Sequence, residues 1–227
     1  MKVKFSSSQR GESGLLDLLV MLIAVAIMAM IGYAYVTDQR ANSKAKRIQC
    51  VSNLKCLGLA VRIWAGDNGE KNPARVSVTN GGAMELAGRG AVFPHFQVMS
   101  NEIGTPKILI CPADRGRKYS TNFGSLTDAN ISYFIGLDAD ETQPQGWLVG
   151  DHNLATNNVP LKPGLATISS NSLVSWTAQL HVNQGNLSLA DGSAKQLSNS
   201  GLRRSVSNAL PVYSNATTNW SFRVAIP

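Results

Sequence analysis

Residues 15–36 read LLDLLVMLIAVAIMAMIGYAYV, an apolar run with a single charged residue, Asp17, near its N-terminal end. From Leu18 to Val36 there are nineteen residues without a charge or a proline. At ~1.5 Å rise per residue they would cover about 28 Å, close to the thickness of the hydrocarbon layer of a bilayer. The run therefore predicts a transmembrane helix over residues 13–36.

Residues 1–12 form a basic leader that contains Lys2, Lys4 and Arg10. A basic leader before an apolar run also fits a secretory signal peptide. The run is longer than a typical signal core and no clear small-residue cleavage site follows it, so a retained anchor is favoured. We expect a cytoplasmic N-terminus, because a domain follows the helix and long domains cross the membrane largely regardless of charge.

The helical pattern continues over residues 37–65. Between Lys44 and Trp64 there is no proline, and five apolar residues fall within one arc at 3.6 residues per turn: Leu54, Leu57, Ala60, Val61 and Trp64. The opposite side carries Lys44, Arg47, Lys55 and Arg62, which predicts a solvated basic face. Gly66, Asn68 and Gly69 predict the end of the helix.

The net charge of +7 raises the question of nucleic-acid binding. Residues 1–75 carry eleven Lys or Arg and five Asp or Glu, whereas residues 76–227 carry ten and nine. A basic groove for DNA would need the excess on the folded domain, so nucleic acid is a disfavoured partner. The length after the helix suits one globular domain, which we expect over residues 66–227.

Three cysteines, Cys50, Cys56 and Cys111, admit two interpretations. Cys50 and Cys56 would lie ~240° apart around one helix, so they cannot bond to each other. Either of them could form a disulfide with Cys111, leaving the third thiol free; alternatively all three are reduced and buried. No Cys-x-x-Cys pair or neighbouring Cys and His residues suggest zinc, so no metal and no cofactor are predicted.

The C-terminal half predicts antiparallel strands, with loops and short strands between Gly81 and Asp140. Residues 172–182, 186–190 and 193–197 are expected to form a three-stranded meander, with a tight turn at Asp191 and Gly192. His181 and Asp191 would then lie near the ends of adjacent strands, where they could form an acid-base or metal site with Asp151 and His152. The alternative is a turn aspartate and a hydrogen-bonded histidine, and we favour it because no catalytic motif accompanies these residues.

Several motifs together resemble one family. Asp17-Leu18-Leu19-Val20 matches the end of the Phe-Thr-Leu-Ile-Glu-Leu-Leu-Val segment of type IV pilins and type II secretion pseudopilins. Residues 50–60, CVSNLKCLGLA, are similar to a helix found in a large group of pilin-like proteins from planctomycete and verrucomicrobial bacteria. The same group carries a His followed after nine residues by Asp-Gly, which His181, Asp191 and Gly192 reproduce, with Gly185 between them.

The resemblance implies roles for the N-terminal residues. In pilins the residue that corresponds to Asp17 is thought to pair with the free N-terminal amine of a neighbouring subunit and to set the stagger of the helices. If Asp17 is the fifth mature residue, the chain is cut before Ser13, and Glu12 stands where the family has Gly. A cut after Gly11 or after Gly14 would instead make Asp17 the sixth or the third residue. Without the resemblance, Asp17 could equally lie at the headgroup boundary or cap the helix.

The resemblance therefore implies an α+β pilin-like fold, with a long N-terminal helix and a head of antiparallel β-sheet. It also implies a structural role in a pseudopilus or pilus-like filament rather than an enzymatic one. The implied partners are copies of the chain or other pilin-like subunits, an assembly platform in the bacterial inner membrane, a prepilin peptidase that also methylates the new N-terminus, and the lipid bilayer. The alternative is a membrane-anchored periplasmic enzyme or ligand-binding module that uses His181 and Asp191.

Overall fold

The computed structural model describes residues 9–139, 142–209 and 221–227, with side chains from Gly14 onward. The chain divides into two compact units, Met1–Ala45 and Lys46–Pro227. Residues 1–8 of the predicted leader lie outside the described residues. So do the side chains of Gly11, Glu12 and Ser13, although their backbone is helical. The predicted processing site is therefore not tested.

Helix α1 spans Gln9–Asp67 and so includes both segments predicted to be helical. Every large apolar side chain from Leu15 to Val36 is solvent-exposed, from 46% at Val36 to 74% at Tyr33. Within the described residues, this helix is long and apolar enough to cross a membrane, and none of its most apolar stretch is buried. The single candidate membrane span predicted from the sequence is thus present.

The predicted end of α1 is confirmed. The helix stops at Asp67, and the next residues reverse the chain: Gly69 and Glu70 have φ values of 67° and 59°. The backbone N–H of Glu70 donates to the carbonyl of Ala65 at 2.9 Å, and the side-chain amide of Asn68 donates to the carbonyl of Trp64 at 2.8 Å. These bonds satisfy carbonyls that the helix end leaves without partners.

The head also keeps the predicted apolar arc. Leu54, Leu57, Ala60, Val61 and Trp64 are all buried. The prediction of a solvated basic face is wrong for Arg47. Its guanidinium is half-buried and donates hydrogen bonds to Gln184 and to the carbonyl of His181. Lys55 and Arg62 are exposed, as predicted.

The loops and short strands expected between Gly81 and Asp140 are present in part, as the loop over residues 110–127 and the short strand β1 (Tyr133–Gly136), but much of the segment after α1 is built from short helices. They are η1 (Pro73–Arg75), η2 (Val78–Asn80), α2 (Met84–Ala87), α3 (Phe93–Val98), α4 (Ser100–Ile103), η3 (Pro106–Leu109) and η4 (Asp128–Asn130). Proline occupies the first turn of η1, α3 and η3, where its missing N–H costs nothing. Gly and Pro therefore start and stop single helical turns here instead of bounding strands.

The strands form two antiparallel sheets. The larger has the order β5 (Gly164–Ser169), β9 (Ser221–Ile226), β1 (Tyr133–Gly136), β2 (Trp147–Asp151), β7 (Gln184–Leu189) and β8 (Ala194–Ser198). The smaller has the order β4 (Val159–Pro160), β3 (Leu154–Thr156) and β6 (Val174–Trp176). Helix α5 (Asn199–Ala209), which the sequence analysis did not predict, follows β8.

The predicted meander is confirmed only in its second half. Strands β7 and β8 form the expected hairpin, in which Leu187 pairs with Lys195 and Gly192 has the positive φ of 81° that the turn requires. The first predicted strand, 172–182, is wrong. The strand there spans only Val174–Trp176 and pairs with β3 in the smaller sheet, and residues 178–183 form turns.

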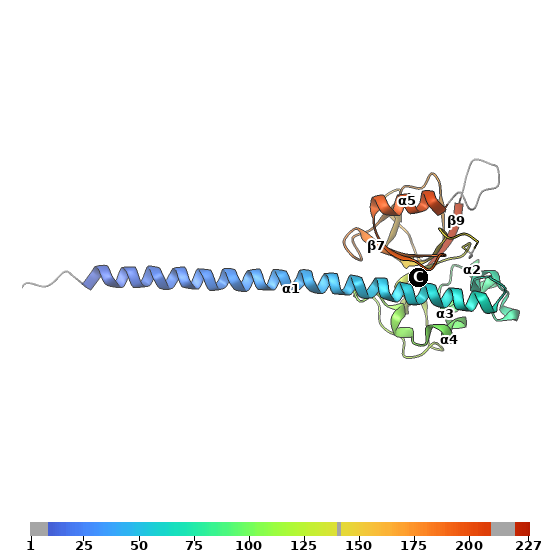
Figure 1. Ribbon diagram of the computed structural model, residues 1–227, viewed down its shortest axis with the longest axis horizontal. Coiled ribbons are helices and arrows are strands. Elements are labelled where there is room, and N and C mark those ends of the chain that lie inside the picture. The colour runs from blue at the N-terminus through green and yellow to red at the C-terminus, as the bar shows by residue number, and fades with distance from the viewer. Residues whose placement is uncertain (1–8, 140–141, 210–220) are drawn as a thin grey trace, which may run out of the picture. The chain divides into compact units, whose positions relative to one another are not determined.

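The large sheet separates two cores (Figure 1). One face packs on the buried arc of α1 and on the short helices; the other packs on α5 and β6. Successive side chains of β1 point to opposite faces of the sheet. Tyr133 and Ile135 therefore belong to the first core, and Phe134 belongs to the second. Helix α1 approaches β7 closely, since a Cβ at Gly58 would lie 2.2 Å from the Ser188 hydroxyl. This close packing brings α1 side chains against β7, which lies next to the edge strand β8.

Candidate functional site

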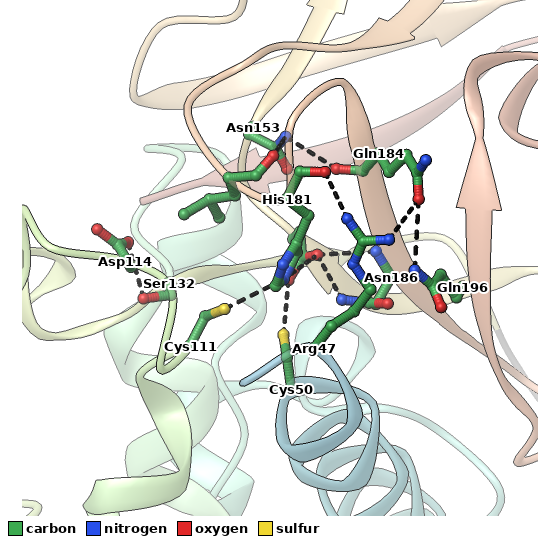
Figure 2. Close-up of polar contacts among 12 residues, drawn as sticks. Arg47, Cys50, Cys111, Asp114, Ser132, Asn153, His181, Gln184, Asn186 and Gln196 are labelled. Atoms are coloured by element: carbon green, nitrogen blue, oxygen red, sulfur yellow. Dashed lines mark hydrogen bonds and ion pairs between the residues drawn. The ribbon is translucent and has the colours of Figure 1, made fainter. Parts of the chain in front are cut away.

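Four buried side chains of metal-binding type meet where α1 crosses the large sheet. Figure 2 labels three of them, Cys50, Cys111 and His181. Cys50 comes from α1, Cys111 from the segment after η3, Asp151 from the end of β2 and His181 from the turn before β7. One ligand atom from each lies within 4.8 Å of the others. The four residues are 0, 0, 0 and 8% exposed, respectively. We call them the Cys50 cluster.

The contacts within the Cys50 cluster are short. The Cys50 thiol donates to Oδ1 of Asp151 at 3.1 Å. The Sγ of Cys111 lies 3.3 Å from Nε2 of His181, and the same nitrogen lies 3.5 Å from Oδ2 of Asp151. The Tyr133 hydroxyl approaches the Cys50 Sγ at 3.5 Å from the side.

His181 is held in an unusual backbone conformation. His181, Val182 and Asn183 have φ values of 49°, 51° and 57°, so three successive non-glycine residues are left-handed. Each such residue costs about 1 to 2 kcal/mol, and such strain clusters at functional sites. The conformation turns the chain back into β7 while directing the imidazole into the head.

Polar bonds from two sides hold this turn (Figure 2). Arg47 donates from Nη2 to the carbonyl of His181 at 2.7 Å and from Nη1 to Oε1 of Gln184 at 2.6 Å. The amide of Asn153 donates to the carbonyls of Thr177, Leu180 and Gln184 at 2.9, 3.2 and 3.3 Å. The position of His181 is therefore fixed by α1 and by the segment after β2.

Asp151 is fixed by Asn186, the neighbouring residue on β7. Its Oδ2 accepts from the Asn186 backbone N–H at 2.7 Å and from the Asn186 side-chain amide at 2.9 Å. Full burial raises the pKa of Asp151 to about 7, against the charge of His181 and the hydrogen bonds from Cys50 and Asn186, which lower it.

The two buried thiols differ in acidity. Interaction with the neighbouring Cys50 thiol and contact with His181 lower the pKa of Cys111 to about 5 in spite of burial. Burial, the neighbouring Cys111 thiol and the charge of Asp151 raise the pKa of Cys50. Burial lowers the pKa of His181, but the hydrogen bond with Cys111 and the charge of Asp151 outweigh it and the net direction is upward. Cys111 is therefore the more acidic of the two buried thiols.

The arrangement does not match a Cys-His-Asp catalytic triad. In a triad the carboxylate binds one ring nitrogen of the histidine and the nucleophile contacts the other. Here Cys111 and Asp151 both approach Nε2 of His181. A second thiol, Cys50, lies against the carboxylate, and the cluster is closed to solvent.

The residues of the predicted His181 and Asp191 site lie apart. They flank opposite ends of β7, a six-residue strand of about 20 Å. Asp191 is exposed and its Oδ1 accepts from the Ser193 N–H at 2.8 Å, so it is a turn aspartate. His152 turns away to the carbonyl of Ser132, 2.9 Å from Nδ1. Of the four residues considered together in the sequence, only Asp151 and His181 are in contact.

Gly185 has a packing role that the sequence does not disclose. A Cβ there would lie 2.5 Å from ring carbons of Trp176. The indole of β6 therefore stacks directly on the β7 backbone just after the His181 turn.

All three cysteines are free in this structure. Cys56 is exposed, whereas Cys50 and Cys111 are both buried in the Cys50 cluster. Of the two predicted disulfides, only Cys50 with Cys111 joins neighbouring residues of this cluster. The pairing itself stays a prediction.

The expectation of no metal site rested on spacing along the chain. The residues of the Cys50 cluster are far apart in the sequence: Asp151 follows Cys111 by 40 residues and His181 follows Asp151 by 30. Their spacing therefore does not indicate that they meet in the fold. Asp151, Asn153 and Asn186 have no sequence signal that ties them to the cysteines. Cys50 and His181 both lie within the motifs quoted for the pilin-like resemblance, and this is the only hint.

Comparison with known protein families, curated proteins and solved structures finds no match to this chain. The class that fold and site define is thus an α+β protein with one candidate membrane-spanning helix and a head that contains a buried cluster of two cysteines, an aspartate and a histidine.

Proposed function

We propose that this chain is a pilin-like structural subunit that assembles through the apolar part of α1 into a pseudopilus or pilus-like filament. The observation that carries the proposal is the exposure of every large apolar side chain between Leu15 and Val36. A helix that is apolar on all sides is stable only in lipid or among other helices. A filament that draws subunits from the inner membrane offers both environments in turn.

Asp17 is the one charged residue in this apolar stretch. A carboxylate within a bilayer costs on the order of 2.5 to 3.5 kcal/mol on insertion scales, and a cation that meets it removes the penalty. The free N-terminal amine of a neighbouring subunit is such a cation. In this proposal Asp17 pairs with it and fixes the stagger of adjacent helices, with the head in the periplasm.

Replacing Asp17 tests the assembly role. Asp17→Ala should abolish incorporation of the chain into filaments sheared from the cell surface, while its level in the inner membrane stays unchanged. Asp38→Ala is the matched control, because Asp38 is an exposed carboxylate on the same helix beyond the apolar stretch. Normal assembly of Asp17→Ala would contradict the pairing role.

N-terminal mass spectrometry of the purified protein tests the class independently. An N-methylated start at Glu12 or Ser13 is expected if a prepilin peptidase processes the chain. An intact Met1 would contradict processing and favour a permanent anchor.

A further inference from the structure

The side chains of the Cys50 cluster offer ligand atoms at separations close to those that zinc requires. With Zn–S near 2.3 Å and Zn–N and Zn–O near 2.0 to 2.2 Å, tetrahedral ligand atoms lie about 3.4 to 3.8 Å apart. The observed separations are 3.1 Å for Cys50 Sγ to Asp151 Oδ1, 3.3 Å for Cys111 Sγ to His181 Nε2 and 3.5 Å for His181 Nε2 to Asp151 Oδ2. The two Asp151 distances involve different carboxylate oxygens, and one ligand atom from each residue lies within 4.8 Å of the others, so small side-chain rotations would let the four residues share one ion.

The direction of the side chains supports the same conclusion. Cys111 and Asp151 both approach Nε2 of His181, although that nitrogen can carry one proton and so serve one of them. Two thiols, a carboxylate and an imidazole nitrogen that converge on one point are ligands for a divalent cation, and the combination of S, N and O donors is suited to zinc.

Hydrogen bonds from neighbouring residues hold Asp151 and His181 in place. Asn186 donates two hydrogen bonds to Oδ2 of Asp151, at 2.7 and 2.9 Å. Arg47 holds the carbonyl of His181 at 2.7 Å, and the strained left-handed turn keeps the imidazole directed into the cluster. Such outer contacts orient ligands and raise metal affinity.

We propose that Cys50, Cys111, Asp151 and His181 bind one zinc ion at a closed structural site. The four ligands fill the tetrahedron and are almost fully buried, so the ion would hold structure rather than activate water. It would fasten α1 to β2, to the segment after η3 and to the turn before β7. This inference goes beyond the proposed function and does not depend on it.

The competing state of the same residues is a Cys50–Cys111 disulfide. A disulfide uses the two sulfur atoms and gives no role to a buried carboxylate and a histidine nitrogen beside them. Zinc uses all four groups, and Asn186 and Arg47 with them. The two states differ in zinc content and in the number of free thiols.

The test uses the full chain purified in detergent from cells supplied with zinc and without added oxidant. Elemental analysis should find one zinc per chain, and maleimide labelling after denaturation should count three thiols without prior reduction. Replacing zinc by Co²⁺ should give the intense visible bands and the sulfur-to-metal charge-transfer band of a tetrahedral thiolate site.

Variants locate the ion. Cys111→Ser and His181→Asn should each lower the zinc content at least about tenfold. Asn tolerates the left-handed backbone at position 181, so His181→Asn removes the ligand while keeping the turn. Cys56→Ser is the matched control, since Cys56 is an exposed thiol on the same helix, and it should keep one zinc. Wild-type protein without zinc or with a Cys50–Cys111 disulfide, or unchanged zinc in both ligand variants, would overturn the proposal.

Discussion

His95 is a buried histidine of α3 outside the Cys50 cluster. It is fully buried, and neither ring nitrogen has a hydrogen-bond partner among the described residues. Burial lowers its pKa to about 4, from an ordinary value of 6.5. The protonated imidazole is therefore poorly tolerated in the folded head.

This burial predicts a loss of stability in mild acid. The unfolded chain takes up the proton near pH 6.5, whereas the folded chain takes it up only near pH 4. The free energy of unfolding is therefore at its full value above pH 6.5 and decreases as the pH falls from 6.5 toward 4. The full effect is on the order of 3 kcal/mol. Denaturant unfolding of the purified chain at several pH values between 7.5 and 4.5 measures it.

His95→Leu is the control for this prediction. The substitution removes the titrating group and replaces two unpaired buried nitrogens with an apolar side chain, so stability at pH 7 should change little. His181 and the acidic residues titrate in both proteins, and the difference between the two pH profiles isolates His95. Parallel profiles would contradict the prediction.

The turn between β6 and β7 is strained as an element. Val182 is a β-branched residue in the left-handed region, with φ of 51°, and its side chain is 74% exposed. The side chain thus adds a backbone penalty without contributing to the core. Asn183 shares the conformation but tolerates it better, because Asn visits the left-handed region readily.

Glycine at position 182 should therefore stabilise the head. Removing the left-handed penalty gains about 1 to 2 kcal/mol, and the greater freedom of glycine in the unfolded chain costs roughly 0.5 to 1. We expect Val182→Gly to raise the free energy of unfolding by about 0.5 to 1 kcal/mol in equilibrium denaturation. Asn183→Gly should change it by less, and a destabilised Val182→Gly would show that the turn is not strained.

The elements differ in how far sequence predicts them. Periodicity found the arc from Leu54 to Trp64 and the stop at Asp67, because both depend on neighbours within a few residues. It misread residues 172–182 as one strand, since apolar β-prone residues do not reveal that the chain turns after Trp176. The turn is specified by distant partners, Arg47 and Asn153, whose hydrogen bonds stabilise it.

The Cys50 cluster depends on the whole head for the same reason. Cys50 and Asp151 are neighbours only because Gly58 lets α1 lie against β7 and because β7 pairs with β2. Local sequence contains none of these contacts. The membrane-length helix, by contrast, is visible in composition alone, since its apolar residues lie on every side of it.

At the scale of the whole molecule, the surface between Leu15 and Val36 should decide where the chain resides. Its side chains are exposed apolar groups, so the full chain should stay with membranes after alkaline carbonate washing and be released by detergent. Ile23→Arg combined with Ile27→Arg places two charges near the centre of the stretch, at about 2.5 to 3.5 kcal/mol each on insertion scales. This pair should move most of the protein into the carbonate-soluble fraction.

Ile48→Arg is the matched control for this double variant. Ile48 is also an exposed apolar residue of α1, 62% exposed against 52% for Ile23 and 47% for Ile27, but it belongs to the unit Lys46–Pro227. If lipid contact alone determines retention, Ile48→Arg stays with the membrane and the double variant does not. Equal release of both would mean that general surface polarity, and not a spanning segment, holds the chain there. Retention of the double variant would mean that contacts other than this helix anchor the protein.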